Sequence, residues 1–183
     1  MSAGETPGRG VCPVRLEDML AAREARAKAQ RFLLAGWRGC LVSFTLNLAG
    51  EVKSGCRAAA AFDSGLSALL SALGAAGIRY EPPFLRRLFT GDEAYLLCES
   101  APEPVKRIAE GIERDHPAGR LFDFDVLDGR GRKLSRTELG LGERRCFVCG
   151  RPAFECARSG RPSAGGAGEK VDKSVVTVWV GER

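Results

Sequence analysis

The sequence contains a single histidine, His116, among its 183 residues. One imidazole excludes a His-rich zinc centre and a two-His iron site, and a Ser-His-Asp triad could be built only around this side chain. His116 precedes Pro117 at the end of a helical pattern. We therefore interpret it as a helix-terminal residue lying near backbone carbonyls.

The sequence also lacks the apolar segments that membranes and export require. No apolar run approaches the roughly 20 residues of a membrane helix, and residues 1–20 have no apolar signal core. The composition, 44% hydrophobic and 28% charged, is that of a globular protein. We expect a cytoplasmic protein without a membrane partner, in which the seven cysteines are reduced thiols or partly a metal site.

Positive charge is in modest excess. The net charge of +5 suits an anionic ligand or an acidic partner. It is too small to argue for DNA, and we expect no nucleic-acid partner.

Apolar periodicity predicts an α+β fold. Helices are expected at 16–34, 56–77 and 102–117, and strands at 39–50, twice within 78–100, at 120–128 and, briefly, at 133–136. After the first helix the order is β-α-β-β-α-β. This order is typical of a ferredoxin-like split βαββαβ antiparallel sheet with helices on one face, here with an extra N-terminal helix.

Individual residues refine this expectation. Leu66, Leu69, Leu70 and Leu73 form the apolar stripe of the second helix, and Asp63 or Ser64 is a candidate cap for it. Pro82 and Pro83 make the strand near them an edge strand or a broken one.

Changes in composition divide the chain into four parts. Residues 1–13 are rich in Gly and Pro and are expected to be flexible, and 14–142 form the main domain. Residues 143–159 form a Cys-rich C-terminal extension, and 160–183 a Gly-rich tail of divergent character.

Two aspartates interrupt an apolar strand in the stretch GRLFDFDVLDGRG. Because strand side chains alternate, Asp123 and Asp125 are expected on one face together with Leu121, with Phe122 and Phe124 on the other. Two close carboxylates repel unless a cation lies between them. Mg²⁺ with bound phosphate meets that need, and Asp-x-Asp strands hold metal in phosphoryl- and nucleotidyl-transfer sites. The other interpretation is that both are solvated surface residues.

The cysteine cluster CFVCGRPAFEC has the spacing Cys-x₂-Cys-x₆-Cys, at Cys146, Cys149 and Cys156. The first pair has the spacing of a zinc knuckle. No histidine follows, so a fourth zinc ligand would have to be a distant cysteine (Cys12, Cys40, Cys56 or Cys98) or a water. Three reduced cysteines without zinc are the alternative, and because structural zinc is normally four-coordinate we expect little or no zinc.

Several stretches together resemble the apo-citrate lyase phosphoribosyl-dephospho-CoA transferase family, also called the holo-acyl-carrier-protein synthase of citrate lyase. The resemblance covers about residues 16–159, and its pieces run in family order. They are LEDMLAAREARAKAQ (16–30), VSFTLNLAGEVKSG (42–55), TGDEAYLL (90–97), HPAGRLFDFDVLDGRGRKLSR (116–136) and ERRCFVCGRPAFECARS (143–159).

The resemblance implies a nucleotidyltransferase. Such an enzyme moves phosphoribosyl-dephospho-CoA from triphosphoribosyl-dephospho-CoA to a serine of the citrate lyase acyl-carrier (gamma) subunit and releases pyrophosphate. The reaction requires an electrophilic α-phosphorus and neutralisation of the leaving pyrophosphate.

The site residues expected from this chemistry lie within the matching stretches. Asp123 and Asp125 would hold Mg²⁺, and Arg136 would act on the leaving pyrophosphate. The candidate substrate-binding residues are Arg23, Arg26, Asn47, Lys53 and Arg120. For Arg23 and Arg26, which lie three residues apart on one helix face, the pattern alone favours the alternative of a solvated basic face.

Two other functions compete with the transferase. One is a nucleotide- or RNA-binding ferredoxin-like module with a zinc knuckle, although paired aspartates on the open face would repel phosphate without metal. The other is an inactive scaffold that still binds the acyl-carrier subunit. Metal-dependent release of pyrophosphate separates the transferase from both.

Overall fold

The computed structural model describes residues 13–140, 142 and 155. These residues form three α-helices and four strands, with short 3₁₀ turns at Gly119–Leu121 and Thr137–Leu139. The elements follow one another as α1 (Leu16–Leu34), β1 (Cys40–Leu46), α2 (Cys56–Ala75), β2 (Phe84–Arg86), β3 (Glu93–Cys98), α3 (Pro102–Asp115) and β4 (Phe122–Leu127). The α+β class expected from the sequence is therefore confirmed.

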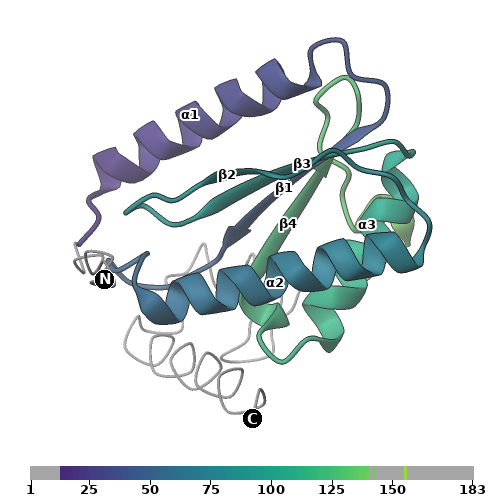
Figure 1. The fold of residues 1–183 in the computed structure, drawn as a ribbon. Helices are drawn as coiled ribbons and strands as arrows, with labels where there is room; N and C mark the ends of the chain where they lie inside the picture. Colours follow the sequence, from purple (N-terminus) through teal and green to yellow (C-terminus); the bar gives the residue numbers. More distant parts are fainter. Residues whose placement is uncertain (1–12, 141, 143–154, 156–183) are drawn as a thin grey trace, which may run out of the picture.

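The four strands form one antiparallel sheet in the order β2-β3-β1-β4 (Figure 1). Thr45 of β1 lies opposite Glu93 of β3 on one side and opposite Asp123 of β4 on the other. Ser43 lies likewise between Tyr95 and Asp125. The register therefore sets two polar rows across the sheet.

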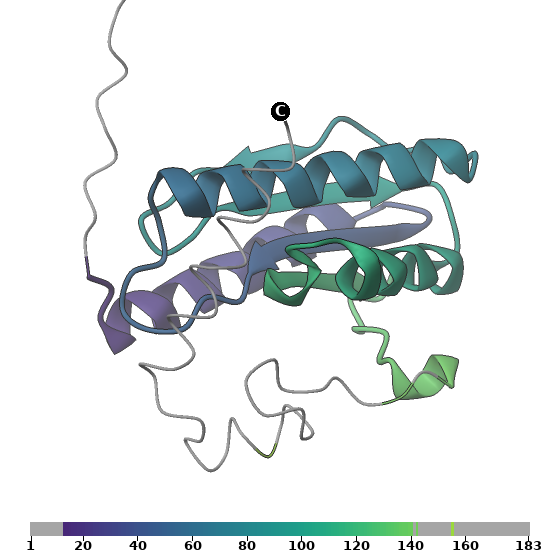
Figure 2. The ribbon, with the colours of Figure 1, turned by 90° about the horizontal axis from the view of Figure 1, so that it is seen from below.

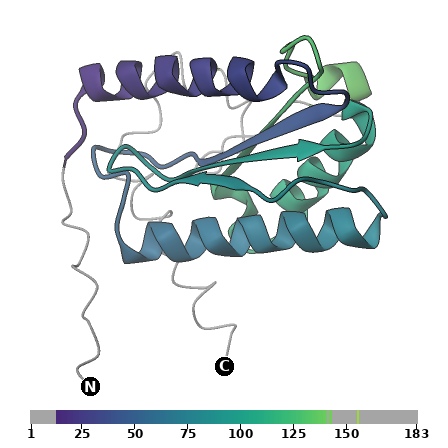
Figure 3. The same cartoon turned by 45° about the horizontal axis from the view of Figure 1, so that its top comes forward.

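Helices cover both faces of this sheet (Figure 3). α2 and α3 lie side by side on one face (Figure 2) and cover the larger core, which includes Val42, Phe44, Leu96 and Phe124. α1 lies over the opposite face, above a smaller cluster formed by Leu34, Leu41, Tyr95 and Leu127. The extra N-terminal helix thus covers the face that carries the two polar rows.

Most predicted boundaries differ from the structure by a few residues. α1 has the predicted bounds, whereas β1 and α2 end before the predicted residues 50 and 77. β2 begins directly after Pro83 and is an edge strand, as expected from the two prolines. The expected strand at 133–136 is reduced to one bridge between Leu127 and Lys133.

Two local predictions were wrong. α2 begins at Cys56 after Gly55, so Asp63 and Ser64 lie inside the helix rather than at its cap. β4 begins at Phe122 because residues 119–121 form a 3₁₀ turn, which breaks the two-residue alternation. Leu121 consequently packs in the core under α2 and α3 and not on the face of Asp123.

By length and composition, α2 could cross a membrane, with a mean hydropathy of 1.3, contrary to the expectation that no segment approaches this limit. Its apolar side instead packs against the sheet, with Phe62, Leu66, Leu69 and Leu73 buried. Because its apolar stripe packs against the sheet in this way, α2 is a core helix.

An aromatic cluster joins α2 to the centre of the sheet. The Phe44 ring stacks on Phe62 and Phe124 with centroid separations of 4.8 and 4.3 Å, and it meets the edge of Phe122 at 5.5 Å. Gly65 of α2 lies directly over these rings. A Cβ atom added at Gly65 would lie 2.7 Å from Phe44 Cζ and 2.9 Å from the Phe122 ring.

We predict that Gly65→Ala destabilises the protein by about 1–3 kcal/mol, because the added methyl group overpacks the aromatic cluster. The control is Gly74→Ala in the same helix, where no atom lies within 4 Å of the new Cβ. Helix propensity alone should make that variant more stable by about 0.5–1 kcal/mol. Urea unfolding of the three proteins checks this, and equal stability of the two variants would contradict the packing argument.

Candidate functional site

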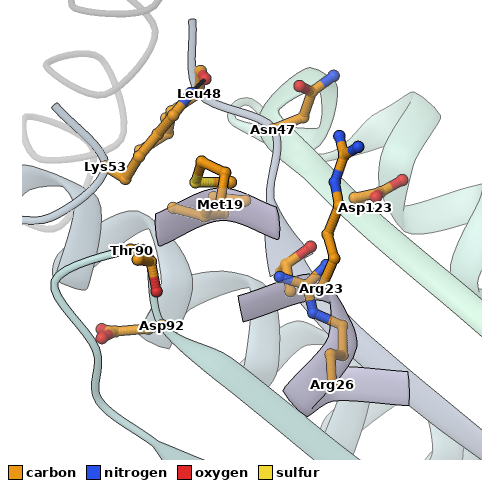
Figure 4. A pocket seen from close by; sticks show the side chains of 12 residues that line it. Met19, Arg23, Arg26, Asn47, Leu48, Lys53, Thr90, Asp92 and Asp123 are labelled. Carbon is orange, nitrogen blue, oxygen red and sulfur yellow. Dashed lines mark hydrogen bonds between the residues drawn. The ribbon is translucent and has the colours of Figure 1, made fainter. Parts of the chain in front are cut away.

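A pocket of about 170 Å³ lies between α1, the segment that follows β1 and the turn before β3 (Figure 4). It is lined by Met19, Arg23, Arg26, Thr45, Leu46, Asn47, Leu48, Lys53, Thr90, Gly91, Asp92 and Asp123. In Figure 4, Arg23, Asn47 and Asp123 lie on one side of Met19, and Lys53, Thr90 and Asp92 on the other. The pocket thus joins segments that are far apart in the sequence.

The pocket lining combines cations with a carboxylate from β4. Arg23, Arg26 and Lys53 contribute three positive charges, against two negative charges from Asp92 and Asp123. Guanidinium groups provide planar forks that match phosphate oxygens. The lining is therefore suited to an anionic ligand that binds to the cationic side chains and lies close to the Asp123 carboxylate.

Four of the five predicted substrate-binding residues line this pocket. They are Arg23, Arg26, Asn47 and Lys53. Arg23 and Arg26 lie three residues apart in α1, so the helix places both over the sheet. The interpretation of these two arginines as a purely solvated face does not fit Arg26, whose side chain is only 23% exposed.

Arg26 is held by a buried carboxylate that the sequence analysis did not identify. Glu93, whose side chain is 1% exposed, accepts hydrogen bonds from Arg26 Nε at 3.0 Å and Arg86 Nη1 at 3.1 Å. Tyr95 Oη donates a third hydrogen bond to it at 2.6 Å. Because Nε is engaged, the Arg26 side chain is oriented by the sheet before any ligand arrives.

The turn at 90–92, on the other side of the pocket, is also held in place by ion pairs. Arg87 bridges Asp92 Oδ2 at 2.8 Å and Asp63 Oδ1 at 2.5 Å, so it ties the turn at 90–92 to α2. Its guanidinium carbon lies 5.0 Å from the centre of the Phe62 ring. Lys53 Nζ donates to the backbone oxygen of Leu48, and burial lowers the pKa of Lys53.

Asp123 and Asp125 project from the same face of β4, as predicted, but only Asp123 lines the pocket. Asp125 forms an ion pair with Lys133, beyond the end of the strand. Burial and the negative charge of Asp123 raise the pKa of Asp125, whereas the charges of Lys133 and Lys106 lower it. The two carboxylates therefore repel each other, and cations relieve this repulsion.

The remaining predicted phosphate-binding arginines do not line the pocket. Arg120 is exposed in the 3₁₀ turn that precedes β4. Arg136 forms ion pairs with Glu110 and Glu113 of α3, the second at 3.5 Å, and its Nε donates to the backbone oxygen of Gly142 at 3.1 Å. A direct role for either residue in catalysis or substrate binding stays a prediction.

The single histidine is a structural residue. His116 is the C-cap of α3, its Nδ1 accepts a hydrogen bond from the backbone N–H of Ala118, and its Nε2 lies 3.2 Å from Ser64 Oγ. Since Nδ1 is an acceptor, the neutral ring carries its proton on Nε2, and this N–H donates a hydrogen bond to Ser64 Oγ. In this tautomer His116 does not serve as a base for Ser64.

The candidate zinc ligands Cys146, Cys149 and Cys156 lie outside the described residues. Two of the distant cysteines considered as a fourth ligand, Cys40 and Cys98, are buried opposite each other on β1 and β3. In the part of the chain that the structure describes, no group of three or more His, Cys, Asp or Glu side chains could hold a metal ion.

Comparison with known proteins identifies the family of this chain. The family model for apo-citrate lyase phosphoribosyl-dephospho-CoA transferases matches residues 14–176. This chain belongs to that family. The match includes α1, all four strands and every residue of the pocket, and it extends past residue 159, where the resemblance in the sequence ended.

Relatives with that family name come from different bacteria. A probable apo-citrate lyase phosphoribosyl-dephospho-CoA transferase of Streptococcus pyogenes is 39% identical over 149 residues, which are 79% of this chain and 77% of the relative. A protein of Vibrio cholerae with the same name is 36% identical over 151 residues, 82% of this chain and 85% of the relative. These matches do not favour the RNA-binding alternative.

Some residues of the site could not be found from sequence. Glu93 carried one signal, its two-residue spacing from Tyr95, which placed both on one face of a predicted strand. Its partner Arg26 is 67 positions away, and no local pattern joins them. Met19 and Asp92 carried no pattern that distinguished them from surface residues.

We predict that Glu93→Gln lowers the free energy of unfolding by about 3 kcal/mol, because it leaves Arg26 and Arg86 without their buried counter-charge. The matched control is Glu99→Gln, which breaks the exposed pair of Glu99 with Arg79. That change should cost at most about 1 kcal/mol. Urea unfolding measures both, and similar losses in the two variants would contradict the importance of the buried position.

Proposed function

We propose that this chain transfers phosphoribosyl-dephospho-CoA from triphosphoribosyl-dephospho-CoA to a serine of the citrate lyase acyl-carrier subunit. In this reaction the serine Oγ attacks the α-phosphorus, the bond from that phosphorus to the pyrophosphate oxygen breaks, and the serine proton is lost. A phosphodiester and free pyrophosphate result. Membership of the family supports this proposal, and so does the pocket that sets Arg23, Arg26 and Lys53 beside Asp123.

The cationic residues of the pocket would bind the phosphates of the donor. The donor's triphosphate carries several negative charges, and the two arginines with Lys53 would neutralise them and orient the chain of phosphates. Arg26 would do so from a fixed position, because its Nε is bound to Glu93. Such preorganised cations stabilise charge that develops on the leaving pyrophosphate.

Asp123 and Asp125 fit a Mg²⁺ site of the kind that substrate phosphates complete. Magnesium in phosphoryl-transfer sites is usually bound through one or two carboxylates together with phosphate oxygens, so a larger acidic cluster is not required. The mutual repulsion that contributes to the raised pKa of Asp125 is what a divalent cation would relieve. When bound, Mg²⁺ would supply charge neutralisation at the donor phosphates.

We also infer that the sheet with α2 and α3 is a ferredoxin-like split βαββαβ unit. The element order β1-α2-β2-β3-α3-β4 supports this inference, as does the sheet order β2-β3-β1-β4 with every neighbouring pair antiparallel. α1 would then be an addition that closes the second face and carries the two arginines to the pocket.

The acceptor protein would approach over apolar side chains next to the pocket. Leu20, Val52 and Phe89 are 49%, 42% and 49% exposed, and each is adjacent in sequence to the pocket-lining residue Met19, Lys53 or Thr90. The backbone N–H of Val14 donates to the oxygen of Glu51 at 2.8 Å, which holds the start of α1 against the loop that carries Val52. Exposed apolar groups of this kind mark protein–protein contact sites.

The direct test is incubation of the full chain with triphosphoribosyl-dephospho-CoA, Mg²⁺ and the apo-acyl-carrier subunit, followed by intact mass measurement. We predict that the subunit gains the mass of phosphoribosyl-dephospho-CoA and that pyrophosphate appears in equal amount. Asp123→Asn should lower turnover about 100-fold or more, because it removes the carboxylate in the pocket. The control Asp115→Asn changes an exposed aspartate at the end of α3 and should keep wild-type turnover.

Each result of this test has a definite meaning. A wild-type protein that binds the acyl-carrier subunit without modifying it would reject the transferase in favour of the inactive scaffold. Full turnover of Asp123→Asn at saturating Mg²⁺ would reject the role of that carboxylate.

We predict that Leu20→Ser and Phe89→Ser each raise KM for the acyl-carrier subunit about tenfold, because buried apolar contacts of an interface dominate its affinity. KM for the donor should stay unchanged. Phe32→Ser is the matched control, because Phe32 is 80% exposed near the other end of α1. An equal effect of all three substitutions on KM for the acceptor would place the docking surface elsewhere.

A further inference from the structure

Phe124, the residue between the two aspartates, has its backbone held by α3. β4 is an edge strand of the sheet, and Phe124 lies opposite Phe44 of β1. Its N–H donates to Glu113 Oε1 at 3.0 Å, and its C=O accepts from Lys106 Nζ at 3.0 Å. Since backbone groups alternate in direction along a strand, those of Phe124 point away from β1, and the α3 side chains take the place of a fifth strand.

Both clamping side chains are charged and buried. Lys106 is 5% exposed and Glu113 is 8% exposed. Two further charges balance them: Glu110 lies 2.9 Å from Lys106, and Arg136 forms ion pairs with Glu110 and Glu113. The four side chains together carry no net charge, although both oxygens of the Glu110 carboxylate are buried without a hydrogen bond of regular geometry.

Stability alone is a weak reason for this cluster. A buried ion pair is often no more stabilising than apolar residues of the same volume, and an edge strand can be protected by a covering apolar helix. The feature that apolar residues could not supply is a donor and an acceptor on the two backbone groups of Phe124. The cluster therefore acts at one backbone position, between Asp123 and Asp125.

We propose that Lys106 and Glu113 are positioning residues that fix Phe124 and thereby hold the carboxylates of Asp123 and Asp125 in the arrangement that binds a divalent cation. This inference rests on the proposed function for the identity of the cation site. Two carboxylates on one strand face repel, and a strand edge without a partner strand can yield to that repulsion. Partners outside the metal's own ligand shell commonly alter metal affinity 10- to 100-fold by fixing the ligands. In this arrangement Arg136 acts through Glu110 and Glu113.

The test compares Glu113→Ala with Glu113→Gln. Glutamine keeps an acceptor oxygen for the Phe124 N–H, whereas alanine removes it. Two measurements on the folded protein do not require activity: hydrogen exchange of the Phe124 amide, and broadening of the β4 amide signals during titration with Mn²⁺ alone. Glu103→Ala, a change at an exposed residue in the first turn of the same helix, is the control.

For Glu113→Ala we expect the Phe124 amide to exchange about tenfold faster, and the Mn²⁺ midpoint to rise about tenfold or more. Glu113→Gln and the control should stay within about threefold of wild type on both measurements. Lys106→Met, which removes the donor to Phe124 but keeps an apolar stem, should raise the Mn²⁺ midpoint in the same way. Lys106→Met therefore tests the positioning role if Glu113→Ala does not fold.

The opposite results are equally clear. If Glu113→Ala or Lys106→Met lowers stability but leaves the Mn²⁺ midpoint unchanged, the proposal is overturned. The cluster would then serve only to protect the edge of β4. A wild-type protein whose β4 signals do not respond to Mn²⁺ would also overturn it. Failure of the wild type to modify the acyl-carrier subunit, with Mn²⁺ binding retained, would reject the transferase and leave the positioning role standing.

Discussion

Alternation along β4 is the constraint on which the rest of the site depends. Phe122, Phe124 and Val126 point into the core beneath α2 and α3, so the residues between them must face the other way. Asp123 and Asp125 are therefore held on the α1 face, where both are half-buried. The strength of the apolar core on one side fixes the position of the carboxylates on the other.

A carboxylate held on a half-covered face requires positive charge nearby, and α1 and the edge of the sheet supply it. Glu93, in the same polar row as Asp123, is neutralised by Arg26 and Arg86, and Asp125 by Lys133. Arg26 belongs to this charge balance and also lines the pocket. The ion pairs that neutralise the carboxylates of the sheet thus also leave an oriented cation in the lining of the pocket.

Gly65 of α2 shows how closely the two faces of the sheet are linked. Gly65 lets the Phe44 and Phe122 rings approach the helix axis, which brings the centre of β1 and the start of β4 together. The Thr45 position, between Glu93 and Asp123, follows from the same strand pairing. Packing on the apolar face therefore sets distances on the polar face.

Local sequence patterns predicted the elements well where the pattern was long or chemically strong. The Ala-, Arg- and Leu-rich segment 16–34 became α1 with the predicted bounds, and Pro82 and Pro83 precede an edge strand. Short-range turns were less predictable. The 3₁₀ turn at 119–121 reversed the side expected for Leu121, because a turn of three residues leaves no periodic signal.

Sequence also identified five residues of the pocket. Asp123 stood out as a carboxylate in an apolar strand, whereas Arg23, Arg26, Asn47 and Lys53 lie in stretches that resemble the family and suit phosphate chemistry. Sequence grouped Arg136 with the aspartates because they are neighbours in the chain, whereas the fold turns Arg136 toward Glu110 and Glu113. It did not reveal Glu93 as the residue that orients Arg26.

The amino-acid sequence by itself determined the family, the helix and strand content, and the face on which Asp123 and Asp125 lie, because each depends on ordered motifs or on alternation between neighbouring residues. Only the tertiary structure decided that Asp123 faces the pocket while Asp125 pairs with Lys133, and that Lys106 and Glu113 hold the backbone between them. Those contacts depend on how α1 and α3 pack against the sheet. Packing of this kind is set by the whole core and leaves no signature in any short stretch of the chain.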